Sequence, residues 1–305
     1  MADQDGLVSA AIGIIMSFRE IFLKKNELRD YYLWKRASEY QNKTHTQKYK
    51  IRSFFHPVLH GLIKLNRLLV ERQRISIIGE KISYTEKPVI FAVTHIGKFD
   101  YQIVTEVLKV YQIPFSGDPE KMYRTFEGFI LWLNGVIYCD TDNRGDRKVG
   151  YHTMVNTLRA GYNVLIYPEG VWNISPNQLV LPLFPGVIKC ADETGCEIIP
   201  IGIVQQGKEF YVRIGENLHI DSSRAIMIDK KAYLDSQKTI LRDVMATLQY
   251  ELMSSLGTFC RAEFGEYECE RKKYVKEKLL EWCDSKTKEP YYSEELISSR
   301  VFRTK

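Results

Sequence analysis

The chain has 305 residues, of which 45% are hydrophobic, and a formal net charge of +5. A chain of this length and composition buries a sizeable core, which excludes a disordered protein. Its six cysteines lie scattered, without the C-x-x-C spacing or the neighbouring histidines of a zinc site. We therefore expect free thiols in a reducing cytosol, and neither a metal nor a bound cofactor.

The N-terminal region is basic and has a helical pattern. From Arg19 to Arg74 the sequence holds 14 basic and 5 acidic residues, with aromatic residues interleaved. The apolar run from Leu7 to Phe18 is shorter than the roughly 20 residues that a transmembrane helix needs. Its acidic N-terminal flank excludes a secretory signal peptide. We predict that residues 1–74 form basic amphipathic helices, which suit an anionic membrane surface or a nucleic acid.

One helix of this region has a distinct stripe. Helical spacing relates Phe55, Val58, Leu59, Leu62, Asn66 and Leu69, whereas His60, Lys64 and Arg67 fall on another face. Such a helix either packs against the rest of the protein or lies in the headgroup layer of a membrane. The pattern slightly favours packing.

From about Ile75 the pattern changes to short β-rich runs separated by helices. The candidate strands are Val89 to Val93, Gly135 to Cys139, Val164 to Tyr167, Ile198 to Ile203 and Phe210 to Ile214. This alternation predicts an α/β domain over residues 75–260, with a mostly parallel sheet flanked by helices. Its functional groups are expected at the carboxyl ends of the strands.

Two further segments complete the chain. The stripe of Leu241, Val244, Met245, Leu248 and Leu252 predicts one long amphipathic helix that packs on the core. Residues 261–305 form a charged tail, which we predict to be helical and without a chemical role.

The most informative pair of residues is His95 and Asp100, directly after the first candidate strand. Residues five apart do not share a helix face, so the two side chains meet only if His95 lies in the strand-to-helix turn. A carboxylate bound to one ring nitrogen fixes the imidazole tautomer and leaves the other nitrogen as a general base. By itself the pair is equally compatible with a helix-capping aspartate and an incidental histidine.

Three later blocks carry turn and strand signals. Pro168, Glu169 and Gly170 form a turn after a candidate strand, where either a site or an ordinary exposed turn is possible. The other two blocks are Phe184-Pro185-Gly186 and Ile199-Pro200-Ile201. Their order and spacing after His95 are more informative than their composition.

Taken together, these residues resemble the glycerolipid acyltransferase family of the PlsC type, typified by lysophosphatidic acid acyltransferase. The H-x-x-x-x-D block of the family matches His95 and Asp100, and its P-E-G-T block matches residues 168–170. Its second block is approximated by residues 135–140, and its V-P-V block by residues 199–201. The resemblance covers roughly residues 75–215, and four ordered blocks are far more specific than a single motif.

The resemblance implies a transfer of a fatty acyl group from acyl-CoA or acyl carrier protein to a hydroxyl of a lysophospholipid-like acceptor, in phospholipid biosynthesis. His95 and Asp100 are then catalytic, and no covalent enzyme intermediate is needed, in agreement with the absence of a Gly-x-Ser-x-Gly elbow from the sequence. The co-substrate is the thioester, and the partners are membrane lipids rather than nucleic acid. We expect a peripheral protein on the cytoplasmic, inner face of a membrane.

Departures from the family pattern concern the acceptor. Family members usually carry an arginine at the positions of Thr141 and Trp172, and neither threonine nor indole binds phosphate in a bidentate way. We therefore expect either an acceptor without a glycerol phosphate group, or a phosphate that binds through the shifted cluster of Arg144, Arg147 and Lys148. The predicted substrate-binding residues are Glu169, Gly170, Arg144, Thr141, Lys98 and Trp172. The alternatives are acylation of an amine or sugar lipid, and a lipid-binding protein without turnover.

Overall fold

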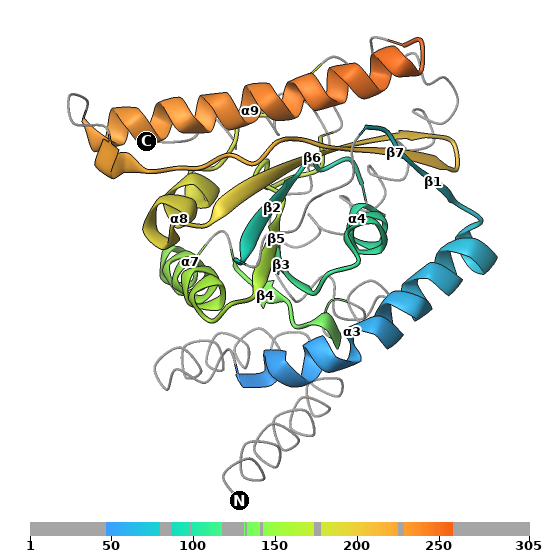
Figure 1. Cartoon of the computed structure of the whole chain (residues 1–305), viewed down its shortest axis with the longest axis horizontal. Helices are drawn as coiled ribbons and strands as arrows, with labels where there is room; N and C mark the ends of the chain where they lie inside the picture. The colour runs from blue at the N-terminus through green and yellow to red at the C-terminus, as the bar shows by residue number, and fades with distance from the viewer. Residues whose placement is uncertain are drawn as a thin grey trace, which may run out of the picture. The chain divides into compact units, whose positions relative to one another are not determined.

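The computed structural model describes residues 47–79, 87–97, 99–117, 131, 133–140, 143–173, 178–224 and 229–258. In this part of the chain, seven strands follow the order β1-β7-β6-β2-β5-β3-β4 (Figure 1). The pairs β1 with β7, β2 with β6 and β3 with β4 are parallel, whereas β6 and β7 form an antiparallel hairpin. The predicted α/β class, with a mostly parallel sheet flanked by helices, is confirmed.

The chain divides into two compact units, residues 1–62 with 110–164 and residues 63–109 with 165–305. The predicted domain boundaries at residues 74 and 260 stay a prediction, because residues 1–46 and 259–305 lie outside the described part of the chain. The proposed N-terminal docking segment is likewise described only from residue 47 onward.

The first unit contains the greater part of α3 (Gln47–Asn66), then β3 (Gln112–Ser116), β4 (Ile137–Tyr138), α7 (Arg144–Arg159) and the start of β5 (Asn163–Ile166). Helix α7 begins where the Asn143 carboxamide oxygen accepts from the backbone N–H groups of Gly145 and Asp146. Gly150 lets the helix approach β4 closely, since a Cβ there would lie 3.2 Å from the Cys139 side chain.

The second unit carries the larger share of the strands. It contains η2 (Arg67–Glu71), β1 (Arg74–Ile77), β2 (Val89–Val93), α4 (Asp100–Leu108), α8 (Gly186–Thr194), β6 (Glu197–Gln206), β7 (Glu209–Ile214), η3 (Ser222–Arg224) and α9 (Lys230–Ser255). All five residues of β2 are buried, as are eight consecutive residues of β6. Strands covered on both faces read as continuous apolar runs, which is why these two were predicted.

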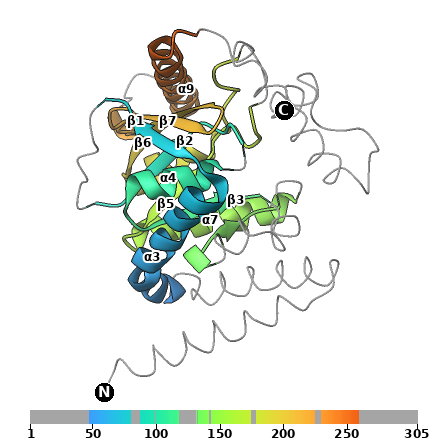
Figure 2. The ribbon, with the colours of Figure 1, turned by 90° about the vertical axis from the view of Figure 1, so that its right-hand side faces the viewer.

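Helix α9 confirms the long amphipathic helix predicted from its stripe. Leu241, Met245, Leu248 and Leu252 are buried, and the helix packs on β6 and β7. Figure 1 shows the helix running along these strands, and in Figure 2, where it is foreshortened, it lies next to them. The strands predicted at residues 135–139 and 164–167 are present as the shorter β4 and as β5, one residue earlier.

The expectation that the stripe of α3 packs on the protein holds for Leu59 and is wrong for its other apolar residues. Phe55 is 56% exposed, Val58 64% and Leu69 66%, whereas the buried face carries Tyr49, His56, Leu59 and Ile63. Arg67, predicted on a polar face, is buried and forms a bidentate ion pair with Glu106, at 2.6 Å and 2.8 Å. The register of the helix is therefore set by a few aromatic and polar side chains that find partners, and the more apolar face is exposed.

Candidate functional site

The candidate site lies in the second unit, in the turn between β2 and α4. Strand β2 ends at Val93, Thr94 and His95 follow it, and α4 begins at Asp100. The aspartate occupies the first turn of the helix, where the helix dipole and unpaired N–H groups favour a carboxylate. His95 thus lies in the strand-to-helix turn, as its spacing from Asp100 required.

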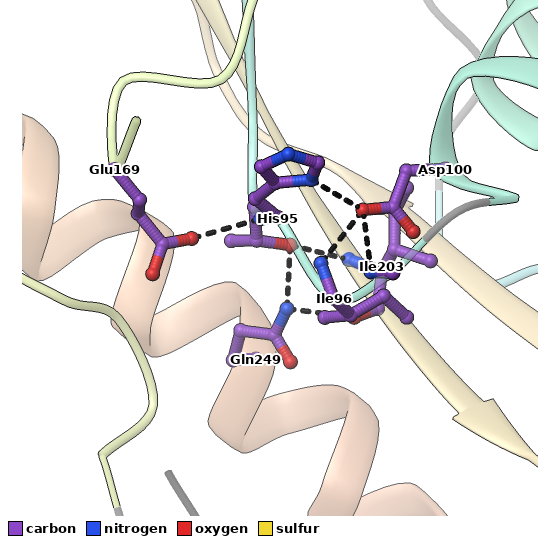
Figure 3. Close-up of polar contacts among 8 residues, drawn as sticks. His95, Ile96, Asp100, Glu169, Ile203 and Gln249 are labelled. Carbon is purple, nitrogen blue, oxygen red and sulfur yellow. Dashed lines mark hydrogen bonds and ion pairs between the residues drawn. The ribbon is translucent and has the colours of Figure 1, made fainter. Parts of the chain in front are cut away.

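The side chains of His95 and Asp100 are in direct contact (Figure 3). His95 Nδ1 lies 2.9 Å from Asp100 Oδ2, and the same oxygen accepts from the backbone N–H groups of Ile96, at 2.6 Å, and Gly97, at 3.0 Å. Asp100 is 1% exposed and the His95 side chain 20% exposed. A carboxylate held by two backbone donors is a fixed acceptor, so Nδ1 carries the proton and Nε2 is the nitrogen left for chemistry.

The backbone of His95 is held from the segment that follows β5. Glu169 is fully buried, and its Oε1 accepts from the His95 N–H at 2.8 Å while its Oε2 accepts from the Leu181 N–H at 2.8 Å. The His95 carbonyl accepts from the Asn173 N–H at 2.6 Å. Both peptide groups of the histidine are therefore bound, which restricts the turn that presents the imidazole.

Two aromatic rings contact the imidazole. Tyr167 stacks on His95 with 4.2 Å between ring centroids and 20° between planes, and Trp172 approaches edge-on at 6.1 Å. Burial, reinforced by the nearby charge of Asp100, raises the pKa of Tyr167 well above its ordinary value. The phenol is therefore neutral over the physiological range and acts here as a flat, polarisable surface.

The turn between Glu169 and Trp172 depends on a glycine. Gly170 has φ +70°, and a Cβ there would lie 2.5 Å from Phe184 Cε2. Its N–H donates to the Tyr167 carbonyl at 3.0 Å. The Pro-Glu-Gly block thus places Tyr167 against the imidazole and Glu169 against the backbone of His95.

The predicted site residues separate into three groups. His95, Asp100, Glu169, Gly170 and Trp172 lie together in the second unit. Arg144 is the exposed first residue of α7, in the first unit. Lys98 and Thr141 lie outside the described residues. Since the Glu169 oxygens bind backbone N–H groups, the geometry supports a bracing role, and its predicted contact with substrate stays a prediction.

Sequence reasoning missed Tyr167, Asn173 and Gln249. Tyr167 was assigned to a strand end, although an aromatic residue directly before a Pro-Glu-Gly turn is placed at the site by that turn. Gln249 interrupts the apolar face of α9 and is fully buried. A lone amide in such a stripe is a usable signal, because a buried amide needs hydrogen-bond partners.

Comparison with known proteins gives a family match and likenesses to solved structures. The model of the Acyltransferase family matches residues 74–204. The crystal structure of the 1-acyl-sn-glycerophosphate (LPA) acyltransferase PlsC from Thermotoga maritima aligns with a TM-score of 0.47 and 11% sequence identity, over 83% of this chain and 98% of that chain. No curated protein matches the chain. The family match confirms the resemblance drawn from the four sequence blocks.

Proposed function

We propose, from the premise that residues 74–204 form an acyltransferase domain, that this enzyme transfers a fatty acyl group from acyl-CoA or acyl carrier protein to a hydroxyl of a lysophospholipid-like acceptor. The observation that carries the proposal is the imidazole of His95, fixed through Nδ1 by Asp100 and partly exposed. In Figure 3 its other nitrogen points away from the carboxylate.

The chemistry follows from this orientation. His95 Nε2 takes the proton of the acceptor hydroxyl while the acceptor oxygen attacks the thioester carbonyl carbon. Asp100 stabilises the imidazolium that forms. The tetrahedral intermediate then collapses, the C–S bond breaks, and the thiolate leaves with the proton returned by His95. The products are an ester and a free thiol, without a covalent enzyme intermediate.

Release of free thiol tests this mechanism. Purified enzyme, acyl-CoA and lysophosphatidic acid are expected to release thiol and form a diacyl lipid, detected by a thiol reagent and by mass spectrometry. His95→Ala is expected to lower the rate by about 100- to 10,000-fold, the size of a general-base contribution. His219→Ala, at an exposed position of the same unit, is the matched control. Binding of lipid without thiol release would instead identify a non-catalytic lipid-binding protein.

A second acceptor class is favoured by one specific contact. Trp172 lies beside His95, where an indole offers an apolar edge and no guanidinium for a phosphate. An amine or sugar lipid is therefore an alternative acceptor, and a panel of acceptors discriminates the classes.

If Arg144 binds phosphate, Arg144→Ala is expected to raise KM for lysophosphatidic acid, whereas Arg159→Ala at the other end of α7 leaves it unchanged. An equal KM in both variants would remove Arg144 from the acceptor site.

The exposed face of α3 and η2 supports the proposed peripheral attachment to a membrane. Its large apolar side chains are between 47% and 78% exposed: Phe54, Phe55, Val58, Leu62, Leu65, Leu68, Leu69 and Val70. We call these eight residues the apolar strip. Burying one large apolar side chain fully in lipid contributes about 1.5–3 kcal/mol.

Three basic residues are exposed in the same segment and suit anionic headgroups: Lys50, Lys64 and Arg72. No helix in the described residues has the length and apolar content of a membrane span.

Vesicle flotation tests the attachment. The enzyme is expected to float with anionic phospholipid vesicles, and Val58→Ser/Leu65→Ser is expected to release it. Ile240→Ser, which removes an exposed apolar side chain of α9, is the control and should float like the wild type. Equal flotation of both variants would exclude the apolar strip as the docking surface. The cytoplasmic side is tested separately, by protease accessibility in inside-out vesicles.

A further inference from the structure

Helix α9 contributes one polar side chain to the base of the His95 turn. Gln249 Nε2 donates to Thr94 Oγ1 at 2.6 Å and to the Ile203 carbonyl at 2.7 Å. The same Thr94 oxygen accepts from the Ile203 N–H at 3.0 Å. Gln249 and Thr94 are both fully buried, and Figure 3 shows the amide directly below the histidine turn. Thr94 is the residue immediately before His95.

Close packing between α9 and β6 makes this contact possible. A Cβ at Gly202 would lie 3.0 Å from Leu248 Cβ and 3.3 Å from the Leu248 carbonyl carbon. The absence of a side chain at Gly202 therefore lets the helix backbone approach the strand beside Ile203. Because the Ile203 carbonyl only accepts, the amide nitrogen of Gln249 must face it, which fixes the orientation of the amide.

Burial of the Gln249 side chain has a free-energy cost, because one of its two polar atoms is unpaired in the described part of the chain. Gln249 Oε1 is buried and has no hydrogen-bond partner among the described residues. Its neighbours on the helix face, Met245 and Leu252, are apolar and buried. A methionine at position 249 would fill a similar volume without leaving an unpaired carbonyl. Packing alone therefore does not account for a glutamine here, whereas its two hydrogen bonds do.

We propose that Gln249 is a positioning residue for His95, acting through Thr94 from outside the family-matched segment. The amide ties the hydroxyl of Thr94 to β6. It thus fixes the start of the turn one residue before the peptide groups that Glu169 and Asn173 hold. Small displacements of a general base lower the rate strongly, because proton transfer and attack require close alignment. The inference rests on the proposed acyl transfer at His95, and it makes α9 a part of the active enzyme.

The test compares an isosteric variant with a packing variant. Gln249→Met is expected to lower kcat per folded enzyme by about tenfold or more, with KM for both substrates unchanged within about twofold. Leu252→Ala leaves a cavity one turn away and is expected to lower Tm further than Gln249→Met, with kcat per folded enzyme unchanged. Thr94→Val should resemble Gln249→Met, and the double variant should be no slower than either single one, since both remove the same link.

A second measurement does not depend on turnover. In protein labelled with ¹⁵N-histidine, the downfield proton on His95 Nδ1, assigned by its loss in His95→Ala, reports the contact with Asp100. Gln249→Met is expected to shift or broaden this resonance, and Leu252→Ala to leave it in place. An unchanged resonance together with a wild-type kcat in Gln249→Met would overturn the proposal. If the wild type itself releases no thiol, the proposed function fails, while the resonance still decides whether Gln249 positions His95.

Discussion

The phenol ring of Tyr167 lies against the imidazole of His95, nearly parallel to it and 4.2 Å from it between centroids. The contact sets the plane of the imidazole, while Asp100 sets its rotation in that plane. The face of a phenol also attracts a cation, so in the proposed mechanism it favours the imidazolium that forms when His95 accepts a proton. We therefore expect Tyr167 to stabilise this charged intermediate as well as to orient the neutral ring.

Two substitutions of Tyr167 distinguish the contribution of its aromatic face from that of its hydroxyl. Stacked aromatic pairs contribute about 0.5–1.5 kcal/mol beyond their buried area, equivalent to roughly two- to tenfold in rate. Tyr167→Leu is expected to lower kcat/KM by about this factor in the thiol-release assay. Tyr167→Phe keeps the face and removes a buried hydroxyl without a hydrogen-bond partner in the described structure, so it should retain the rate and the Tm. Equal losses in both variants would contradict the stacking role.

Glu169→Gln tests the brace on the His95 backbone. A neutral carboxamide keeps the shape, but its NH₂ group must face either the His95 N–H or the Leu181 N–H. Two buried donors then oppose each other, and we expect a loss of about 1–3 kcal/mol in the free energy of unfolding, together with reduced kcat. Urea denaturation and thiol release measure the two effects. Glu193→Gln, at an exposed position of α8, should change neither.

Gly170→Ala combines a backbone effect with a steric one. The positive φ disfavours any side chain, at a cost of order 1–3 kcal/mol. The added Cβ also meets the ring of Phe184. We expect a lower Tm for Gly170→Ala, and a smaller loss of Tm when the same change is added to Phe184→Ala than when it is made in the wild type. Full additivity of the two Tm losses would show that the ring contact contributes nothing.

His56 predicts a pH dependence for the stability of the first unit. Burial lowers its pKa below the ordinary value. The hydrogen bond that His56 Nδ1 donates to Asn134 Oδ1 acts in the opposite direction, and His60 lowers the pKa further. As the pH falls below about 6.5, the unfolded chain therefore takes up a proton before the folded chain does, and the free energy of unfolding decreases.

Urea unfolding between pH 7.5 and 5.5 measures this decrease, which for one group is at most about 1.4 kcal/mol per pH unit. His56→Phe, which keeps a ring but cannot titrate, should show a flatter profile than the wild type. His219→Gln, at an exposed position, should keep the wild-type slope. An unchanged slope in His56→Phe would mean that other groups account for the pH dependence.

The fold was predictable from sequence where strands are buried on both faces. The apolar runs of β2 and β6 identify them directly. Strand β3 was missed because it contains Gln112, Pro114 and Ser116, residues that are uncommon in strands. Its Gln112 carbonyl instead accepts from the Asn134 side chain, a contact between residues 22 apart in the chain. Such a contact cannot be predicted from the amino-acid composition of the strand itself.

The candidate site was predictable only in its local part. His95 and Asp100 are five residues apart, so one turn brings them together and the spacing shows it. Gln249 lies 155 residues from Thr94, and its contact depends on how α9 packs against β6. The exposed face of α3 was predicted wrongly for a similar reason, because its burial depends on tertiary partners of His56 and Arg67.

The two hydrogen bonds to the peptide groups of residue 95 do not involve its imidazole. An alanine at this position therefore inherits the same turn, with an opening between Tyr167 and Asp100 that has the outline of the missing ring. We expect such a variant to bind both substrates without reaction. Free imidazole in the buffer would fit that opening and act as the general base, which would restore part of the turnover.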